Sequence, residues 1–473
     1  MKRIYKYIVS ALVIALPVMI SSCSKDQPTV TEEGESLRYL MGITDSTIFY
    51  SVDNLAEYLA NTSLDDQTGL GKTLVELLYS RKIIDMLERN YLDVGLNQDL
   101  SNRLIFERYI FNYQSTDENG KPIILSGLAI FPNNQEGTSR RWELDNVTLF
   151  SSDLEALAVD CPTISSSPAM LRVLFNSLVV IPDFQGYGVS QTREHPIFHS
   201  RVLARQAIDC ELAAIELARL KRADLAKDYA TYNIGIAYGG MTALQVHKML
   251  ETSEDRNIQS LVNIKSTYCS SPLLDVNAII EDAAARDAID NPWQLTSAMK
   301  AALNTGQLPD TCRISSLMSK GYNTTKVKID GQILTLQEML DTKMYDFENI
   351  SRAYYACNFK TVQAILSEEL ANGYSGKESS PLYKEVYKAI SLDNPAYGWA
   401  PKLPVLIEHS QKDEVIPYYS TFYAYEDLKY STDSEDGNSN VNFRQLLPLE
   451  HKAALLEGYI RILSLKNPTD NLL

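Results

Sequence analysis

The stretch Tyr232–Leu244, which reads YNIGIAYGGMTAL, decides the fold of this chain. Its first half is a short apolar run typical of a buried strand, and its second half has the apolar spacing of a helix. Between them, Gly235, Ala237 and Gly239 alternate in a tight glycine-rich turn. Such a turn holds the residue at its apex in a strained conformation and projects the side chain above the sheet. The stretch therefore predicts a strand, a sharp turn and a helix in direct succession.

The chain on either side repeats this alternation of strands and helices. Two β-rich runs, at residues 103–113 and 122–131, flank a turn-forming segment at 117–120 and predict a hairpin. We expect the other strands at residues 146–150, 178–182, 232–236, 260–264, 404–408 and 441–447, and helices at 200–220, 241–250 and 452–463. A hairpin followed by repeated strand–helix units predicts an α/β fold, with a mostly parallel eight-stranded sheet flanked by helices.

Four motifs in chain order resemble the α/β-hydrolase superfamily, in particular bacterial secreted lipases and esterases. Gly235 and Gly239 match the glycines of its G-x-S-x-G elbow. The segment 181–190, IPDFQGYGVS, followed by His195-Pro196, is similar to the PDYxGxGxS…HP segment of those enzymes. The resemblance covers about residues 100–465, and it implies the α/β-hydrolase fold, hydrolysis of carboxylic esters and no cofactor.

The last two motifs resemble the segments that supply the acid and the histidine of the catalytic triad. EHSQKDEVIP at 408–417 is similar to the HGxxDxxVP segment, and its acid maps to Asp413. LEHKAA at 449–454 is similar to the histidine segment, and its histidine maps to His451. The order of elbow, acid and histidine is the order of the superfamily.

The nucleophile position of the elbow holds Ala237 in place of serine. Ester hydrolysis by a triad needs an oxygen nucleophile whose proton the histidine removes, and alanine has none. In the protease subtilisin, loss of this serine costs about 10⁶ in turnover. The chain is therefore interpreted as a pseudoenzyme whose nucleophile position is vacant.

The oxyanion hole is predicted to be weak. One donor would be the backbone N–H of Tyr238, and the other would come from the turn that begins at Ser151. Related lipases have a glycine in that turn, whereas here Ser151 is followed by Ser152 and Asp153. A negative charge beside a developing oxyanion is unfavourable.

Two functional interpretations follow. The first is a binding or accessory protein that takes a small apolar or amphipathic ligand beneath a helical cap and does not hydrolyse it. The alternative is an active ester hydrolase with a non-standard nucleophile, for which Ser151, Ser152 and Ser190 are the candidates, or with a water directed by His451. Protein partners and the oligomeric state are not predicted.

The N-terminus resembles a bacterial lipoprotein signal. A basic start precedes an apolar run at residues 8–20, which is too short for a bilayer core of about 30 Å and suits a signal peptide. The run ends in ISSC at residues 20–23, similar to a lipobox in which Cys23 is acylated. We therefore expect an exported lipoprotein held at the membrane by its lipid, and the outer membrane rather than the inner one because Ser24 follows the cysteine.

Charge and ligand-type residues exclude other classes. The 473 residues include 44 Lys and Arg against 60 Asp and Glu, a net charge of −16, which disfavours nucleic-acid binding. His195 and His199 have the spacing of a metal pair but no evident third ligand, and the six cysteines form no CxxC motif. No metal site is predicted.

The same patterns predict the domain organisation. Residues 1–22 form the signal peptide and 23–36 a lipidated tether, followed by a helical extension at 37–102. The hydrolase-like core comprises residues 103–269 and 401–473. Between its two parts, residues 270–400 lack a clear strand pattern and predict a helical cap.

Overall fold

The computed structural model of this chain describes the greater part of the 473 residues. The described residues are 29–30, 36–62, 70–87, 89, 104–134, 141–153, 161–253, 262–286, 289, 292–329, 331–336, 338–339, 353–431 and 437–470. The predicted signal peptide and Cys23 lie outside them. The chain divides into a unit of residues 1–37 and a unit of residues 38–473. In the first unit, β1 (Thr29–Val30) pairs antiparallel with β2 (Ser36–Leu37).

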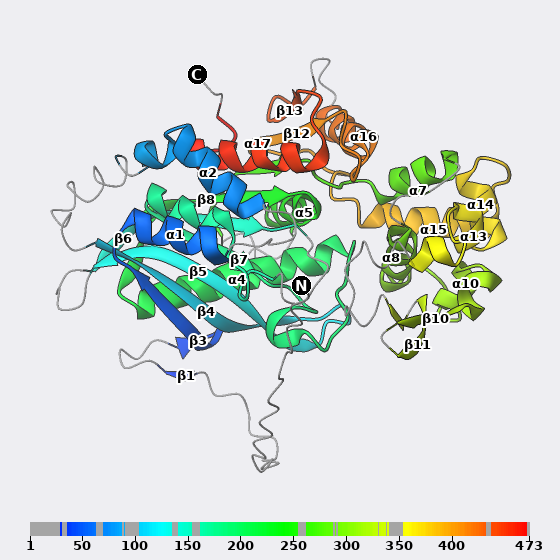
Figure 1. The fold of residues 1–473 in the computed structure, drawn as a ribbon, viewed down its shortest axis with the longest axis horizontal. Helices are drawn as coiled ribbons and strands as arrows, with labels where there is room; N and C mark the ends of the chain where they lie inside the picture. Colours follow the sequence, from blue (N-terminus) through cyan, green and yellow to red (C-terminus); the bar gives the residue numbers. More distant parts are fainter. Residues whose placement is uncertain are drawn as a thin grey trace, which may run out of the picture. The chain divides into compact units, whose positions relative to one another are not determined.

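A sheet of nine strands forms the centre of the second unit within the described residues (Figure 1). Its order is β13-β12-β9-β8-β6-β7-β5-β4-β3. The strands are β3 (Leu40–Phe49), β4 (Leu104–Thr116), β5 (Pro122–Asn134), β6 (Trp142–Ser151), β7 (Ser177–Pro182), β8 (Ala223–Ile236), β9 (Ile264–Ser270), β12 (Val405–Ser410) and β13 (Val441–Leu446). The six strands β13, β12, β9, β8, β6 and β7 run parallel to one another. Strand β5 pairs antiparallel with β7, and β4 and β3 continue this antiparallel end of the sheet. The expected mostly parallel sheet is confirmed.

Helices cover both faces of this sheet (Figure 1). One face carries α4 (Ser200–Leu220), α5 (Tyr238–Thr252) and α16 (Tyr418–Lys429). The other carries α1 (Val52–Thr62), α2 (Leu70–Ser80), the 3-10 helix η2 (Pro168–Phe175) and α17 (His451–Ser464). A second 3-10 turn, η3 (Gly188–Ser190), lies against β5. Strands β7 and β12 are buried along their whole length, as expected for strands covered on both faces.

Three predictions about the sheet were wrong in detail. Residues 40–49, predicted to lie in a helical extension, form the edge strand β3, because their backbone pairs antiparallel with β4. Within this strand only the two end residues, Leu40 and Phe49, are buried. This strand raises the count from eight to nine. The strand predicted at 260–264 begins where that range ends and continues to Ser270 as β9.

The segment between β9 and β12 is mainly helical. Its helices are α7 (Val276–Ala285), α8 (Trp293–Asn304), α9 (Ile314–Leu317), α10 (Lys320–Thr324), α13 (Val362–Ile365), α14 (Glu368–Tyr374) and α15 (Pro381–Leu392). It also contains an unpredicted hairpin of β10 (Lys326–Ile329) and β11 (Gln332–Thr335). Apolar side chains of this segment and of the elbow belong to one buried cluster. Of the helices described, none combines the length and the apolar character that a membrane span requires.

The start of β3 is held by the half-buried carboxylate of Glu216. Three consecutive backbone N–H groups, of Arg38, Tyr39 and Leu40, donate to the carboxylate of Glu216 on α4 at 2.9, 3.0 and 2.8 Å. Hydrogen bonds to an ionised acceptor are stronger than those between neutral groups. The chain therefore enters the second unit at a fixed point beside α4.

Candidate active site

The turn between β8 and α5 has the strained backbone that its sequence predicts. Ala237 adopts φ 50° and ψ −121°, outside the regions that L-residues ordinarily occupy. Its N–H donates to the carbonyl of Ser270 at 2.9 Å, and its carbonyl accepts from Leu273 N–H at 3.3 Å. These bonds to the end of β9 hold the apex in place, and the side chain there is a buried methyl group.

Glycine is required on both sides of this apex. A Cβ on Gly235 would lie 2.3 Å from the carbonyl oxygen of Gly239. A Cβ on Gly239 would lie 2.1 Å from the carbonyl oxygen of Ser151 at the end of β6. Both distances are far below van der Waals contact with backbone, so the helix can approach the sheet this closely only without side chains.

Asp413 and His451 are brought together by two different elements. Asp413 follows β12, and His451 is the first residue of α17. The Nδ1 of His451 lies 2.9 Å from each carboxylate oxygen of Asp413. Asp413 Oδ1 also accepts the backbone N–H groups of Val415 and Ile416 at 3.0 and 2.8 Å. The carboxylate is thus fixed by its own turn and oriented toward the imidazole.

A second histidine, which the sequence reasoning did not single out, also contacts this acid. The Nε2 of His409 on β12 lies 3.3 Å from Asp413 Oδ2 and 3.1 Å from the carbonyl of Ile416. Its Nδ1 lies 2.6 Å from Thr421 Oγ1, and its side chain is fully buried. His409 belongs to the HGxxDxxVP-like segment at 408–417, so the motif itself could have indicated this residue.

The electrostatics of the pair follow from these contacts. Burial raises the pKa of the Asp413 carboxyl, but hydrogen bonds from His409 and His451 outweigh it, so the pKa lies below its usual range. Burial lowers the pKa of His451, whereas the hydrogen bond and charge of Asp413, and the charges of Asp153 and Glu414, raise it above its usual value. The imidazole therefore holds a proton more readily than an exposed histidine does.

The oxyanion side of the site contains a carboxylate. The backbone N–H of Tyr238, the predicted donor, is directed at Asp153 Oδ1 at 3.3 Å. Ser151, the other predicted participant, is fully buried, and its Oγ has no hydrogen-bond partner among the described residues. The sequence indicated a carboxylate in this turn, but not that it would accept the N–H of Tyr238.

Two other serines, Ser190 and Ser271, differ in how their hydroxyl groups are held. Ser190 Oγ accepts the N–H of Gly186 at 3.0 Å and donates to the carbonyl of Tyr187 at 2.9 Å, so its hydroxyl maintains a loop. Ser271, which the sequence reasoning missed, follows β9 in a left-handed conformation with φ 44°. It is fully buried, and its Oγ has no partner among the described residues. The sequence could have indicated Ser271 by its position directly after the strand that pairs with β8.

His195 and His199 have separate structural partners. His195 Nδ1 lies 2.7 Å from the carbonyl of Gln185, whereas His199 Nδ1 lies 3.3 Å from Asp393 Oδ1 at the end of α15. In the part of the chain that the structure describes, no group of three or more His, Cys, Asp or Glu side chains is arranged to hold a metal ion.

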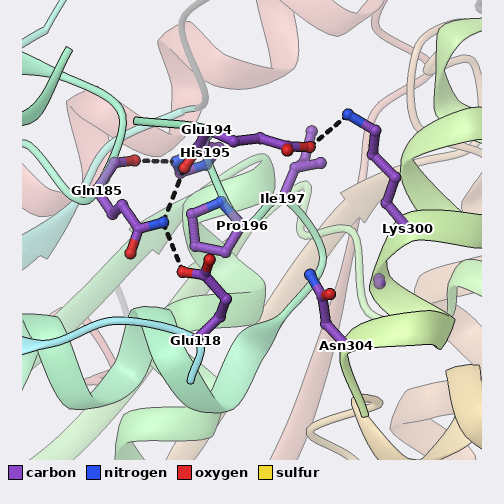
Figure 2. Close-up of a pocket in the computed structure, with 9 residues that line it drawn as sticks. Glu118, Gln185, Glu194, His195, Pro196, Ile197, Lys300 and Asn304 are labelled. Carbon is purple, nitrogen blue, oxygen red and sulfur yellow. Dashed lines mark hydrogen bonds and ion pairs between the residues drawn. The ribbon is translucent and has the colours of Figure 1, made fainter. Parts of the chain in front are cut away.

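A pocket of about 80 Å³ lies between the loop at 185–197, the β4–β5 turn and α8 (Figure 2). Lys300 of α8 forms an ion pair with Glu194 across its upper edge. Gln185 Nε2 donates to Glu118 at 2.7 Å and to the carbonyl of Glu194 at 2.9 Å. Neither Asp413 nor His451 lines this pocket. The ion pair of Lys300 with Glu194 links α8 to the loop at 185–197, and the hydrogen bond of Gln185 to Glu118 links that loop to the β4–β5 turn.

Solved structures with a similar fold include a hydrolase, an esterase and a lipase. A protein named as a hydrolase from Legionella pneumophila matches with a TM-score of 0.58 at 15% identity, over 89% of this chain and 96% of its own. The rice cell wall degrading esterase LipA from Xanthomonas oryzae matches with a TM-score of 0.58 at 13% identity, over 88% and 94%. Candida antarctica lipase A matches with a TM-score of 0.50 at 12% identity, over 76% and 75%. This chain has the α/β-hydrolase fold.

At these identities the likeness shows the fold alone. No protein-family model matches the sequence, and no curated protein matches it either. In the α/β-hydrolase fold the nucleophile is carried by the turn between a central strand and the next helix. The turn at Ala237 lies between β8, a central strand of the sheet, and α5.

Proposed function

We propose that this chain is a lipase- or esterase-like protein that binds a small apolar or amphipathic ligand and has lost ester hydrolysis. The observation that carries the proposal is the apex of the elbow. Ala237 occupies the strained position at φ 50°, and its side chain has no oxygen that could act as a nucleophile. The acid–histidine pair is nevertheless assembled, because His451 Nδ1 lies 2.9 Å from both carboxylate oxygens of Asp413. A triad without its nucleophile retains only substrate binding and the oxyanion hole.

The oxyanion side supports the same proposal. A hydrolase stabilises the tetrahedral intermediate with N–H donors directed at the developing negative charge. The N–H of Tyr238 is instead engaged by Asp153 Oδ1, and a carboxylate at that place repels an oxyanion. Two separate requirements of acyl transfer are therefore unmet.

The test is to restore both features. Wild-type protein should show negligible turnover of p-nitrophenyl butyrate and no labelling by a fluorophosphonate. Ala237→Ser should be labelled at residue 237, and Ala237→Ser with Asp153→Asn should gain a further factor of about 10 to 100, each tenfold being about 1.4 kcal/mol of barrier.

The control is Ala237→Ser combined with His451→Ala, which should not be labelled because no base remains to activate the serine. A folded Ala237→Ser, Asp153→Asn protein without labelling would contradict the proposed ancestry of the site. Strong wild-type esterase activity would contradict the loss of hydrolysis.

A second candidate function is hydrolysis by a water that His451 activates. It is favoured by the assembled acid–histidine pair and by the raised pKa of His451. In this case wild-type protein would turn over esters without forming a covalent adduct, and His451→Ala would abolish the activity. The labelling experiment separates this mechanism from a relocated serine.

We propose in addition that the protein is exported and anchored at the outer membrane through Cys23, on the likeness of residues 20–23 to a lipobox. Stable attachment takes more than one acyl chain, as bacterial lipoproteins carry. Wild-type protein should fractionate with membranes, and Cys23→Ala should be released into the soluble fraction. A Cys23→Ala protein that stays membrane-bound would contradict the anchor.

A further inference from the structure

The ring of His409 has a hydrogen-bond partner at each of its two nitrogens. Nδ1 lies 2.6 Å from Thr421 Oγ1 on α16, and Nε2 lies 3.1 Å from the carbonyl oxygen of Ile416. A neutral imidazole carries a proton on only one nitrogen, which donates, while the other nitrogen accepts. The charge of His409 therefore depends on whether either partner can donate to the ring.

Neither partner has a hydrogen available for the ring. The carbonyl oxygen of Ile416 can only accept, so Nε2 carries the proton of that bond. Thr421 Oγ1 lies 2.5 Å from the carbonyl oxygen of Pro272, which also can only accept. A hydroxyl has a single hydrogen, so Thr421 uses it for Pro272 and offers His409 a lone pair. The hydrogen between Nδ1 and Thr421 must come from the ring.

The surroundings of the ring supply what a buried cation needs. The side chain of His409 is fully buried, and a buried charge is costly unless it is paired and hydrogen-bonded. Asp413 Oδ2 lies 3.3 Å from Nε2 on a side chain that is also fully buried, and it provides the opposite charge. Tyr418 of α16 contacts the ring edge-on at 5.8 Å between ring centres. Each N–H thus has an acceptor, and the charge has a counterion.

The same series of contacts reaches the elbow. Pro272, which accepts the Thr421 hydroxyl, packs against the first turn of α5, because a Cβ on Gly240 would lie 2.3 Å from its own Cβ. The next residue, Leu273, donates its N–H to the carbonyl of Ala237 at 3.3 Å. The turn that holds the triad acid is therefore connected to the elbow through one histidine and one threonine.

We propose that His409 is an imidazolium at neutral pH and a positioning residue for the acid–histidine pair. It holds Asp413 by charge and by the bond from Nε2, and it links this acid to the elbow through Thr421. Asp413 then shares its negative charge between two histidines. The charge of His409 opposes a second positive charge on His451, because the same carboxylate stabilises both.

The first test is ring nitrogen NMR at pH 7.5 on wild-type protein with ¹⁵N in its five histidines. His409 should show two protonated ring nitrogens, whereas a neutral imidazole shows one. A single protonated nitrogen would overturn the proposal. The signals are assigned by their loss in His409→Gln. Should that variant fail to fold, replacing the other histidines one at a time assigns the signals that remain.

The second test compares Thr421→Val with the control Thr421→Ser. Valine has nearly the shape of threonine but leaves the Nδ1 hydrogen without its acceptor, so His409 should lose one of its two ring protons at pH 7.5. Serine keeps the hydroxyl and should keep both protons. Two protonated ring nitrogens in both variants would show that Thr421 does not determine the charge, and would overturn the assignment of its bonds.

The third test distinguishes a charged positioning residue from a merely structural one. In His409→Gln an uncharged amide N–H replaces the charged ring, so the pKa of His451, followed by its ring signals, should rise by about one pH unit. Thr421→Val should raise it in the same direction, and Thr421→Ser should not. A structural role would leave the pKa unchanged or lower it by loosening Asp413, and either result would overturn the shared charge.

None of these measurements uses an ester, so their outcomes are separate from the test of the proposed function. A neutral His409 would overturn the positioning charge and leave the loss of hydrolysis intact. Strong esterase activity of wild-type protein would contradict the loss of hydrolysis and leave the charge of His409 intact.

Discussion

The two sides of the candidate site differ in what they retain. The acid–histidine corner, formed by Asp413, His451 and His409, keeps the contacts that a catalytic pair needs. The elbow corner, formed by Ala237, Tyr238 and Asp153, keeps the strained backbone but lacks a nucleophile and directs a carboxylate at the N–H of Tyr238. One corner thus pairs an acid with a histidine, whereas the other combines a strained backbone with a side chain that carries no oxygen.

The comparison predicts that the elbow backbone matters for stability even without catalysis. Gly239→Ala should destabilise the protein by about 3 kcal/mol or more, because its Cβ would clash with the carbonyl oxygens of Ser151 and Ser152 at 2.1 and 2.4 Å. Unfolding in urea measures this. The control Gly42→Ala has no atom within 4 Å of its added Cβ and should change the free energy of unfolding by less than about 0.5 kcal/mol. Equal stability of the two variants would show that the elbow has relaxed.

The acid–histidine corner should contribute stability of its own. Asp413→Asn should cost about 2 to 3 kcal/mol, because it removes the charge that His451, His409 and two backbone N–H groups stabilise. Asp145→Asn, in a surface pair with Lys466, should cost no more than about 1 kcal/mol. Similar losses in both variants would mean that the acid–histidine pair is no stronger than a surface pair.

The raised pKa of His451 makes this contribution depend on pH. Because the folded-state pKa lies above the usual value of about 6.5, the protonated imidazole stabilises the fold fully below that pH, and the stabilisation is lost as pH rises through the folded-state value. The difference in unfolding free energy between wild type and His451→Gln should be about 1 to 2 kcal/mol at pH 5.5 and should shrink as pH rises through the folded-state pKa. In an Asp413→Asn background the pH dependence should largely disappear. A difference that grows with pH would contradict the assignment.

The smallest expected effect concerns the contact between the elbow and α8. Gln294 Nε2 donates to the hydroxyl of Tyr238 at 2.7 Å inside the protein. Tyr238→Phe should therefore cost about 1 kcal/mol, because the buried amide loses its acceptor. Tyr423→Phe, at a ring that is 53% exposed, should leave the melting temperature unchanged. No effect in either variant would show that α8 is held to the elbow by apolar contacts alone.

Features set by neighbouring residues were predictable from the sequence. The strand, turn and helix around Ala237 follow from glycine spacing and apolar pattern, and the β4–β5 hairpin follows from its turn residues. The β10–β11 hairpin was missed although Asp330-Gly331 between two short strands is a recognised hairpin signal. Strand β3 was missed because most of its side chains are exposed, so no alternation marks it.

Only those site residues that belong to a recognisable sequence motif were predictable. The order of motifs named Asp413 and His451, which the structure brings into contact. The second histidine contact of Asp413 depends on how the turn after β12 folds back, and the direction of the Asp153 side chain depends on how the segment after β6 leaves the sheet. The first contact joins residues only four positions apart, but it requires a turn whose shape residue types alone do not determine, and the second joins residues 85 positions apart in the chain.

The entry point of the chain at Glu216 has a mechanical consequence. Any tension on the segment before Arg38 is transmitted first to the three hydrogen bonds that Glu216 receives, and only then to the pairing of β3 with β4. An edge strand pulled from its end would otherwise separate one residue pair at a time, starting at Leu40 and Tyr113. The carboxylate binds three consecutive donors, so they resist the pull jointly. Glu216 thus protects the pairing of β3 with β4 from a force applied to the chain before Arg38.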